Sequence, residues 1–336
     1  MNLFTHVNAN TVADATTSLA KGKTQVIAGG TDLLCYLRNM CSPNPPSAVV
    51  NIKSITPSLS YIKEEGGMLK VGATTTMETI GASALVAGKY TALAQAAQAV
   101  ASPELRIQAT IGGNICQKPH CNYFRFEYNE FPCVRKDAKL LGVCPAIGTP
   151  SAGGVGTYLS IFGAVNGCWD VCPSDIAPAL VALNASIVTN KKTWKAADFF
   201  VIAGEQINSI AADEIVTEIQ VPTPAAGTKS TYLKFAFRKA FDWPLVSVAA
   251  VVTTSGGSVS AASIVLGGVH PSPKVATAAQ TSITGKAIDA TSAAAAGTAA
   301  VTGAAQVSPA TSTNPGNKYK IQIAQVLVKK ALLAVK

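Results

Sequence analysis

Charged and aromatic residues are scarce in this chain of 336 residues. Asp, Glu, Lys and Arg supply 13% of them, about half the share in typical soluble domains, while Phe, Trp and Tyr supply 6%. The net charge is +9, from 27 basic and 18 acidic side chains, but the basic residues are scattered. A nucleic-acid surface needs a basic stripe interleaved with stacking aromatics, so we expect no nucleic-acid partner. An anionic cofactor or an acidic partner protein accounts for the charge more simply.

Long hydrophobic runs are missing as well. No stretch of about 18 apolar residues occurs, so we expect no membrane span. Residues 1–6 also lack the basic patch and apolar run of a signal peptide. We therefore expect a cytoplasmic protein, unless a partner with its own export signal carries the folded complex elsewhere. In that compartment the eight cysteines are expected to be reduced or bound to metal rather than paired in disulfides.

Several common catalytic motifs are absent too. The sequence contains no G-x-G-x-x-G, Walker A, H-E-x-x-H or G-x-S-x-G motif. Its three histidines, His6, His120 and His270, are too dispersed for a metal triad or a Ser-His-Asp arrangement, and we expect each to be structural. With this length and 48% hydrophobic residues, the chain is predicted to form two or three domains with ample cores.

The order of apolar and turn-forming residues predicts both strands and helices. Strands are expected at 24–28, 48–52, 60–63, 68–71, 185–189, 215–221, 231–237, 246–253 and 259–266, with a hairpin turn at 65–67. Helices are expected at 76–87, 90–100, 174–183 and 319–335, and more loosely over the alanine-rich stretch 277–302. Residues 222–227 are expected to be a linker, and residues 116–172 to be irregular.

A double-glycine turn is the first candidate for chemistry. Gly29 and Gly30 follow the strand at 24–28, and Thr31 and Asp32 are expected to cap the next helix. Glycines let a backbone approach an anion, and a helix start supplies unpaired amide donors, an arrangement suited to a pyrophosphate. A plain tight turn before a helix remains the alternative.

A second double-glycine turn repeats this chemistry. Gly112 and Gly113 lie between Thr110 and Asn114, whose hydroxyl and amide groups can donate to a phosphate or a ring carbonyl. Farther along, Asp175 lies at the start of the helix expected at 174–183. It either caps that helix or accepts hydrogen bonds from ribose hydroxyls.

Six of the eight cysteines fall within residues 116–172. Cys121, Cys133, Cys144 and Cys168 are separated by 11, 10 and 23 residues, unlike the close C-x2-C pairs of zinc ribbons and ferredoxins. Four thiolates from separate loops can still bind a cluster or a metal, and unligated buried or surface thiols are the alternative. Basic side chains that would balance a cysteine-ligated anion are Lys118, His120, Arg125, Arg135, Lys136 and Lys139.

The two glycine turns and the segment at 173–175 together carry a family resemblance. The sequences A-G-G-T-D-L-L at 28–34, A-T-I-G-G-N at 109–114 and P-S-D at 173–175 resemble the FAD-binding subunits of molybdenum hydroxylases, the family of xanthine dehydrogenase and carbon monoxide dehydrogenase. Residues 245–250, 266–269 and 326–332 resemble the C-terminal domain of that family. The resemblance therefore runs nearly end to end.

The resemblance implies a fold and a flavin site. The fold would be α+β, with a two-subdomain FAD-binding domain of the p-cresol methylhydroxylase type at 1–224 (subdomains 1–55 and 56–224) and a CO dehydrogenase flavoprotein C-terminal-like α+β domain at 225–336. The implied FAD contacts are Ile27, Ala28, Gly29, Gly30, Thr31, Asp32, Leu33, Leu34, Thr110, Gly112, Gly113, Asn114, Asp175 and Lys234.

The cysteine-rich stretch 116–172 is similar to an insertion found in part of this family. Subunits like those of 4-hydroxybenzoyl-CoA reductase and a bacterial aldehyde oxidoreductase carry a [4Fe-4S] cluster there. The similarity implies Cys121, Cys133, Cys144 and Cys168 as the four ligands, with Cys172 as the alternative to Cys168.

The implied function is electron transfer. The sequence shows no molybdenum site and no second cysteine set, so oxidation of an aldehyde, an N-heterocycle or an aromatic acyl-CoA is expected on a large molybdenum-cofactor subunit. A small subunit with two [2Fe-2S] clusters and an external electron acceptor would complete the path. Two alternatives stay open: an FAD-only subunit whose cysteines are unligated or zinc-bound, and a cofactor-free scaffold, against which the intact glycines speak.

Overall fold

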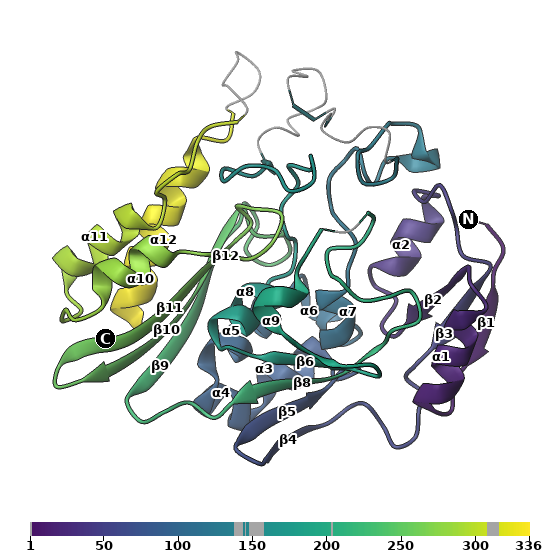
Figure 1. Ribbon diagram of the computed structural model, residues 1–336, viewed down its shortest axis with the longest axis horizontal. Coiled ribbons are helices and arrows are strands. Elements are labelled where there is room, and N and C mark those ends of the chain that lie inside the picture. Colours follow the sequence, from purple (N-terminus) through teal and green to yellow (C-terminus); the bar gives the residue numbers. More distant parts are fainter. Residues whose placement is uncertain (1, 138–143, 145, 148–157, 203, 308–315) are drawn as a thin grey trace.

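The computed structural model describes residues 2–137, 144, 146, 147, 158–202, 204–307 and 316–336. Its strands form three sheets of three, five and four strands, and helices cover them in the expected α+β manner. Figure 1 shows the three-stranded sheet beside the N-terminus, the five-stranded sheet in the middle and the four-stranded sheet beside the C-terminus. Within the described residues, no helix has the length and apolarity that crossing a bilayer requires.

The three-stranded sheet is parallel, in the order β1-β3-β2. Its elements are β1 (Thr5–Asn8), α1 (Val12–Ala20), β2 (Thr24–Ile27), α2 (Leu33–Arg38) and β3 (Ala48–Asn51). Reciprocal hydrogen bonds between Thr11 and Asp14 form a capping box at the start of α1. Because β2 ends at Ile27, the double-glycine turn lies at the carboxyl edge of this sheet, directly before α2.

The five-stranded sheet is antiparallel, in the order β4-β5-β8-β6-β7. Its strands are β4 (Ile62–Glu65), β5 (Met68–Gly72), β6 (Ser186–Thr189), β7 (Thr193–Lys195) and β8 (Val216–Pro222). The helices associated with it are α3 (Met77–Ala82), α4 (Ala84–Lys89), α5 (Thr91–Ala99), α6 (Pro103–Arg106), α7 (Ile111–Ile115), α8 (Ile176–Ala182) and α9 (Ala196–Phe199). The helix expected at 76–87 is divided at Ser83. The extended backbone of Ser83 ends α3, and the Ser83 hydroxyl caps the start of α4.

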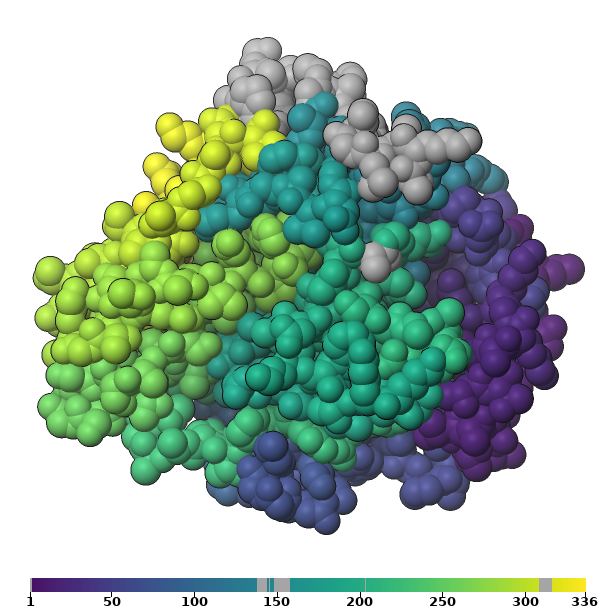
Figure 2. Space-filling view, viewed as in Figure 1, coloured from purple at the N-terminus to yellow at the C-terminus, as the bar shows by residue number. Residues whose placement is uncertain are grey.

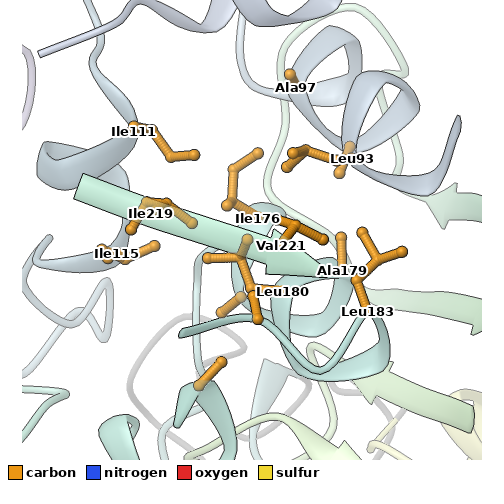
Figure 3. Close-up of a cluster of buried hydrophobic side chains, with 14 of the residues drawn as sticks. Leu93, Ala97, Ile111, Ile115, Ile176, Ala179, Leu180, Leu183, Ile219 and Val221 are labelled. Atoms are coloured by element: carbon orange, nitrogen blue, oxygen red, sulfur yellow. The ribbon is translucent and has the colours of Figure 1, made fainter. Parts of the chain in front are cut away.

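The largest apolar core lies between this sheet and its helices. Figure 3 shows side chains of α5, α7 and α8 pointing toward those of β8, among them Leu93, Ile111, Leu180 and Ile219. All four are fully buried. This core fixes α7, which carries the second double-glycine segment, against the sheet.

The four-stranded sheet is antiparallel, in the order β12-β11-β10-β9, with β9 (Thr228–Phe235), β10 (Val246–Ser255), β11 (Ser258–Gly267) and β12 (Lys274–Val275). Helices α10 (Thr277–Ile283) and α12 (Tyr319–Ala334) pack on it, and α11 (Ala290–Ala299) packs on these two helices. Helices α5 and α8 of the middle layer also contact its strands. The alanine-rich stretch expected to be helical at 277–302 forms two helices, with residues 284–289 non-helical between them. Gly297 lets α11 approach the backbone of α12 at Gln325. Figure 2 shows that the first sheet (purple) and the C-terminal helices (yellow) lie on opposite sides of the molecule.

The described parts of the cysteine-rich stretch 116–172 are irregular, as predicted. They contain one short 3-10 helix, η1 (Glu127–Asn129). The stretch is fastened to the C-terminal layer, since Ile161 N–H donates to Val269 (3.0 Å) and Ala305 N–H donates to Ile161 (2.8 Å). The Nζ of Lys320 on α12, a residue that is 1% exposed, donates to the carbonyl oxygens of Tyr158 and Leu159. Lys139 lies outside the described residues.

Candidate functional site

A cavity of about 390 Å³ opens between the three-stranded sheet and the middle layer. Every predicted FAD contact except Leu34 and Lys234 lines it: Ile27, Ala28, Gly29, Gly30, Thr31, Asp32, Leu33, Thr110, Gly112, Gly113, Asn114 and Asp175. The structure therefore gathers three segments that are far apart in the sequence around one space.

The first double-glycine turn presents unpaired backbone donors to this cavity. Within the described part of the chain, the N–H groups of residues 29–33 donate no hydrogen bond to another protein group. Gly30 has φ of +70°, a conformation that favours glycine. Gly29 has an additional requirement that was not expected, because a Cβ there would lie 2.0 Å from the carbonyl oxygen of Gln108. The close approach that needs Gly29 is to the protein's own backbone.

The second double-glycine segment is the first turn of helix α7, not a separate turn. Thr110 caps this helix, and its hydroxyl accepts from Gly113 N–H at 3.2 Å. Gly112 N–H donates to the Ala73 carbonyl at 2.9 Å, and a Cβ on Gly112 would lie 2.9 Å from the same oxygen. Asn114 accepts from the Ser174 hydroxyl at 2.6 Å, which ties α7 to the start of α8.

Asp32 does not cap α2, which corrects the expectation for this residue. Its carboxylate instead accepts from Arg125 Nη2 (2.5 Å) and from the backbone N–H of Lys118 (2.9 Å), and it lies 3.4 Å from His120 Nε2. Burial disfavours the charge, but the hydrogen bond with His120 and the charge of Arg125 hold the pKa of Asp32 well below its usual range. Asp32 is therefore a paired carboxylate in the cavity wall.

Asp175 does not cap α8 either. Ser174 does so, since its hydroxyl accepts from Ala177 N–H at 3.0 Å. Asp175 accepts from the Tyr232 hydroxyl (2.5 Å) and from Lys234 Nζ (2.9 Å), and the two charged side chains are 5% and 8% exposed. Burial raises the pKa of Asp175, and the charge of Lys234 opposes this rise. Lys234 thus reaches the cavity wall through Asp175, and its own contact with FAD stays a prediction.

Sequence reasoning missed two aromatic groups at this cavity. His120 was expected to be structural, but it lines the cavity and its ring centroid lies 4.2 Å from that of Trp243. Burial lowers the pKa of His120 to about 4, so the imidazole is neutral near pH 7. Trp243, 47% exposed, comes from the β9–β10 connection. The sequence contained one indication of Trp243: it is an aromatic residue close to Lys234 in a chain with few aromatic residues.

Three of the four predicted cluster cysteines, Cys121, Cys133 and Cys144, lie in two apolar groups that share Cys121. Cys121 and Cys133 pack with Tyr36, Cys41 and Phe124, while Cys121 and Cys144 also pack with Tyr123, Ala146, Leu159 and Trp169. Burial raises the pKa of the thiols of Cys121, Cys133, Cys144 and Cys168. Among the described residues, no three His, Cys, Asp or Glu side chains are arranged to hold a metal ion.

Two family models match this chain. The one described as the FAD binding domain in molybdopterin dehydrogenase matches residues 2–224, and the one described as the CO dehydrogenase flavoprotein C-terminal domain matches residues 231–335. The aldehyde oxidoreductase FAD-binding subunit PaoB of Escherichia coli is 29% identical over 282 residues, which are 81% of this chain and 83% of PaoB. The carbon monoxide dehydrogenase medium chain of Hydrogenophaga pseudoflava is 26% identical over 92% of this chain and 88% of its own length.

Solved structures agree with these matches. A chain of the Hydrogenophaga pseudoflava carbon monoxide dehydrogenase that lacks the Mo-pyranopterin moiety superposes with a TM-score of 0.74 at 27% identity, covering 99% of this chain and 97% of its own. Quinoline 2-oxidoreductase from Pseudomonas putida 86 gives a TM-score of 0.73 at 21% identity, covering 100% of this chain and 98% of its own. The second similarity concerns the fold alone.

Proposed function

Because the chain belongs to the family of FAD-binding subunits of molybdenum hydroxylases, we propose that it carries electrons between the iron–sulfur centres of a partner subunit and an external acceptor. Substrate chemistry in this family takes place on the partner that holds the molybdenum cofactor. We propose a complex with that large subunit and with a small subunit carrying two [2Fe-2S] clusters. Aldehydes, N-heterocycles and aromatic acyl-CoA thioesters remain the candidate substrate classes.

The observation that carries this proposal is the row of unpaired amides at residues 29–33 in the cavity wall. Consecutive backbone N–H groups without protein partners beside a cavity can form an anion site, and the pyrophosphate of FAD is the anion this family would place there. Contact with phosphate is not the only reason for glycine at these positions. At Gly29 and Gly112 a neighbouring backbone segment lies too close to leave room for a Cβ. The cavity wall thus supplies donors to the phosphates while the packing of the chain holds those donors in place.

The remaining wall fits the other parts of the cofactor. Leu19, Ile52, Ile215 and Val216 give one region of the cavity an apolar lining. His120 and Trp243 give another region aromatic faces on which a flat ring can stack. When bound, FAD supplies the conversion between two-electron and one-electron transfer. The protein's own part is to orient the cofactor and to shape its surroundings through the buried Asp175–Lys234 pair and the paired Asp32.

We propose further that Cys121, Cys133, Cys144 and Cys168 hold a [4Fe-4S] cluster. Thiolates bound to such clusters are stabilised by N–H···S hydrogen bonds, and suitable donors are present here. The backbone N–H groups of Tyr123 and Phe124 face the Cys121 sulfur, and that of Asp170 faces the Cys168 sulfur; each lowers the pKa of its thiol against the effect of burial. The donor set therefore has the chemistry that a cluster requires, although the side chains do not close around a metal site.

The choice of Cys168 over Cys172 rests on their neighbours. Cys121 packs in one apolar group with Cys133 and in another with Cys144, and the charge of Cys144 contributes to raising the pKa of the Cys168 thiol. Cys172 packs in the apolar core of the middle layer and is fully buried there. We therefore propose Cys168 as the fourth ligand.

Two broader assignments accompany this function. We propose that the boundary between the FAD-binding domain and the C-terminal domain lies in the connection at 223–227, between β8 and β9. We also propose a cytoplasmic location, because no disulfide joins any of the eight cysteines and a reducing compartment preserves that state.

The test is anaerobic purification of the chain together with any partners that co-purify, followed by an absorbance spectrum and quantification of flavin and iron. We expect one FAD and about four irons per chain beyond the iron that co-purifying [2Fe-2S] clusters supply. FAD without this additional iron would support the FAD-only alternative and reject the cluster. A folded chain with neither cofactor would reject the electron-transfer function and support a scaffold role.

A further inference from the structure

A carboxylate in a pyrophosphate site needs an explanation. Asp32 belongs to the same loop as the unpaired amides of residues 29–33, and it lines the same cavity. An ionised carboxylate and the two phosphate charges of FAD repel each other, and the repulsion is strong where water is partly excluded. The loop therefore combines donors that attract the cofactor with a charge that opposes it.

Arg125 compensates this charge from outside the cavity. Its Nη2 donates to Asp32 Oδ1 at 2.5 Å, and the two side chains are 16% and 21% exposed. Arg125 belongs to the cysteine-rich stretch, 93 residues away from Asp32 in the sequence. Arg125 is not among the described residues that line the cavity. We therefore expect no direct contact between Arg125 and the cofactor.

The guanidinium of Arg125 is itself held in place. Its Nε donates to the Pro119 carbonyl at 2.6 Å and its Nη2 to the Lys118 carbonyl at 3.1 Å. Its own carbonyl accepts from the Cys41 thiol at 3.1 Å, and its guanidinium lies 5.7 Å from the centre of the Tyr36 ring. Arg125 therefore meets Asp32 in a fixed orientation, which limits the loss of side-chain entropy on pairing.

We propose that Arg125 is a positioning residue for FAD: by pairing with Asp32 it neutralises and turns aside a carboxylate that would otherwise repel the pyrophosphate. The inference rests on the proposed FAD site. It makes flavin affinity depend on a residue of the cysteine-rich stretch that does not touch the flavin.

The experiment titrates FAD into the flavin-free full-length chain and follows flavin fluorescence. Arg125→Gln is expected to weaken FAD binding about tenfold or more, whereas Arg125→Lys keeps a positive charge and recovers part of the affinity. The double variant Asp32→Asn with Arg125→Gln removes both charges, and we expect it to bind FAD more tightly than Arg125→Gln. Lys70→Gln is the matched control, because it removes one partner of the Lys70–Glu65 pair (2.8 Å) outside the cavity, and we expect no change in affinity.

The rescue separates an electrostatic role from a merely structural one. If Arg125 only braces the fold, removing Asp32 as well leaves binding as weak as in Arg125→Gln or weaker, and the proposal is overturned. Where Arg125→Gln does not fold, Asp32→Asn alone decides: at least wild-type affinity supports the proposal and weaker binding refutes it. A wild-type chain that binds no FAD refutes the proposed function itself, which is a distinct result from wild-type binding without an effect of Arg125.

Discussion

Replacement of Gly29 by alanine tests whether the packing of the protein's own backbone, rather than contact with phosphate, requires glycine in the first loop. The added Cβ would lie 2.0 Å from the carbonyl oxygen of Gln108, 2.8 Å from its carbonyl carbon and 3.2 Å from Ala109 Cα. All three are backbone atoms, so no flexible side chain can move away. The loop at 29–33 and the segment before Thr110 must therefore separate by about 1.4 Å or more to restore ordinary contact.

The expected cost follows from this overlap. Overpacking of a well-packed region costs about 1–3 kcal/mol. For a cooperative unit of roughly 150–250 residues, each kcal/mol lowers the melting temperature by about 2–4 °C, so we expect a loss of about 2–12 °C. Because the two segments that separate carry the two glycine motifs of the cavity, we also expect FAD affinity to fall about tenfold or more.

Thermal melting and FAD titration of the purified variant measure both effects. Gly88→Ala is the control, because Gly88 lies in α4 with no atom within 4 Å of an added Cβ. Alanine is the better helix former by about 1 kcal/mol, so this variant is expected to be as stable as the wild type or more so. Wild-type melting temperature and FAD affinity in Gly29→Ala would refute the packing argument.

Three further predictions concern the flavin loop, the cysteines and a buried lysine. Gly30→Val forces a β-branched residue to φ of +70° beside the Leu34 side chain (3.0 Å), so the soluble variant is expected to lose its yellow colour, and retained flavin would contradict this. Cys133→Ala should lower iron per chain in an anaerobic preparation while Cys35→Ala, at an exposed position, should not; the reverse result would show that the ligands were wrongly chosen. Burial lowers the pKa of Lys320 from 10.5 to about 7. Between pH 7 and pH 10.5 the unfolded chain therefore binds more protons at this residue than the folded chain does. The free energy of unfolding rises with pH in that range, by up to about 1.4 kcal/mol per pH unit. Urea unfolding at several pH values from 7 to 9 should show a smaller slope in Lys320→Met, and equal slopes would exclude this titration.

Local sequence signals predicted most of the elements because those elements depend on local chemistry. The β4–β5 hairpin was predicted from residues 65–67, and Gly66 and Gly67 both adopt positive φ there. Strand β1 was missed because three of its four residues are exposed and no apolar alternation marks it. Helix α1 was missed although Thr11 and Asp14 are the two members of a capping box, a signal that was present in the sequence.

The residues around the cavity were predicted better than their partners. The sequence identified Asp175 at the start of a helix, yet it could not show that Tyr232 and Lys234, 57 and 59 residues farther along, would bind its carboxylate. In the same way, the loop motif identified Asp32 but not Arg125. Helix capping depends on residues that are neighbours in the chain. The pairing of charged side chains depends on which distant segments the three sheets bring together, and a single sequence does not show which segments those are.

Helix α2 connects the two regions that would hold cofactors. It begins directly after the glycine loop, and its Tyr36 ring stacks on Phe124 of the cysteine-rich stretch with centroids 5.5 Å apart. Tyr36, Cys41, Phe124 and Cys133 form one buried cluster, so the helix after the flavin loop and a proposed iron ligand share a core. Electron transfer between two centres requires a fixed separation, and close-packed cores resist deformation. The cysteine-rich stretch therefore packs as part of the FAD-binding domain, and we expect loosening at Phe124 to disturb the glycine loop and the proposed cluster region together.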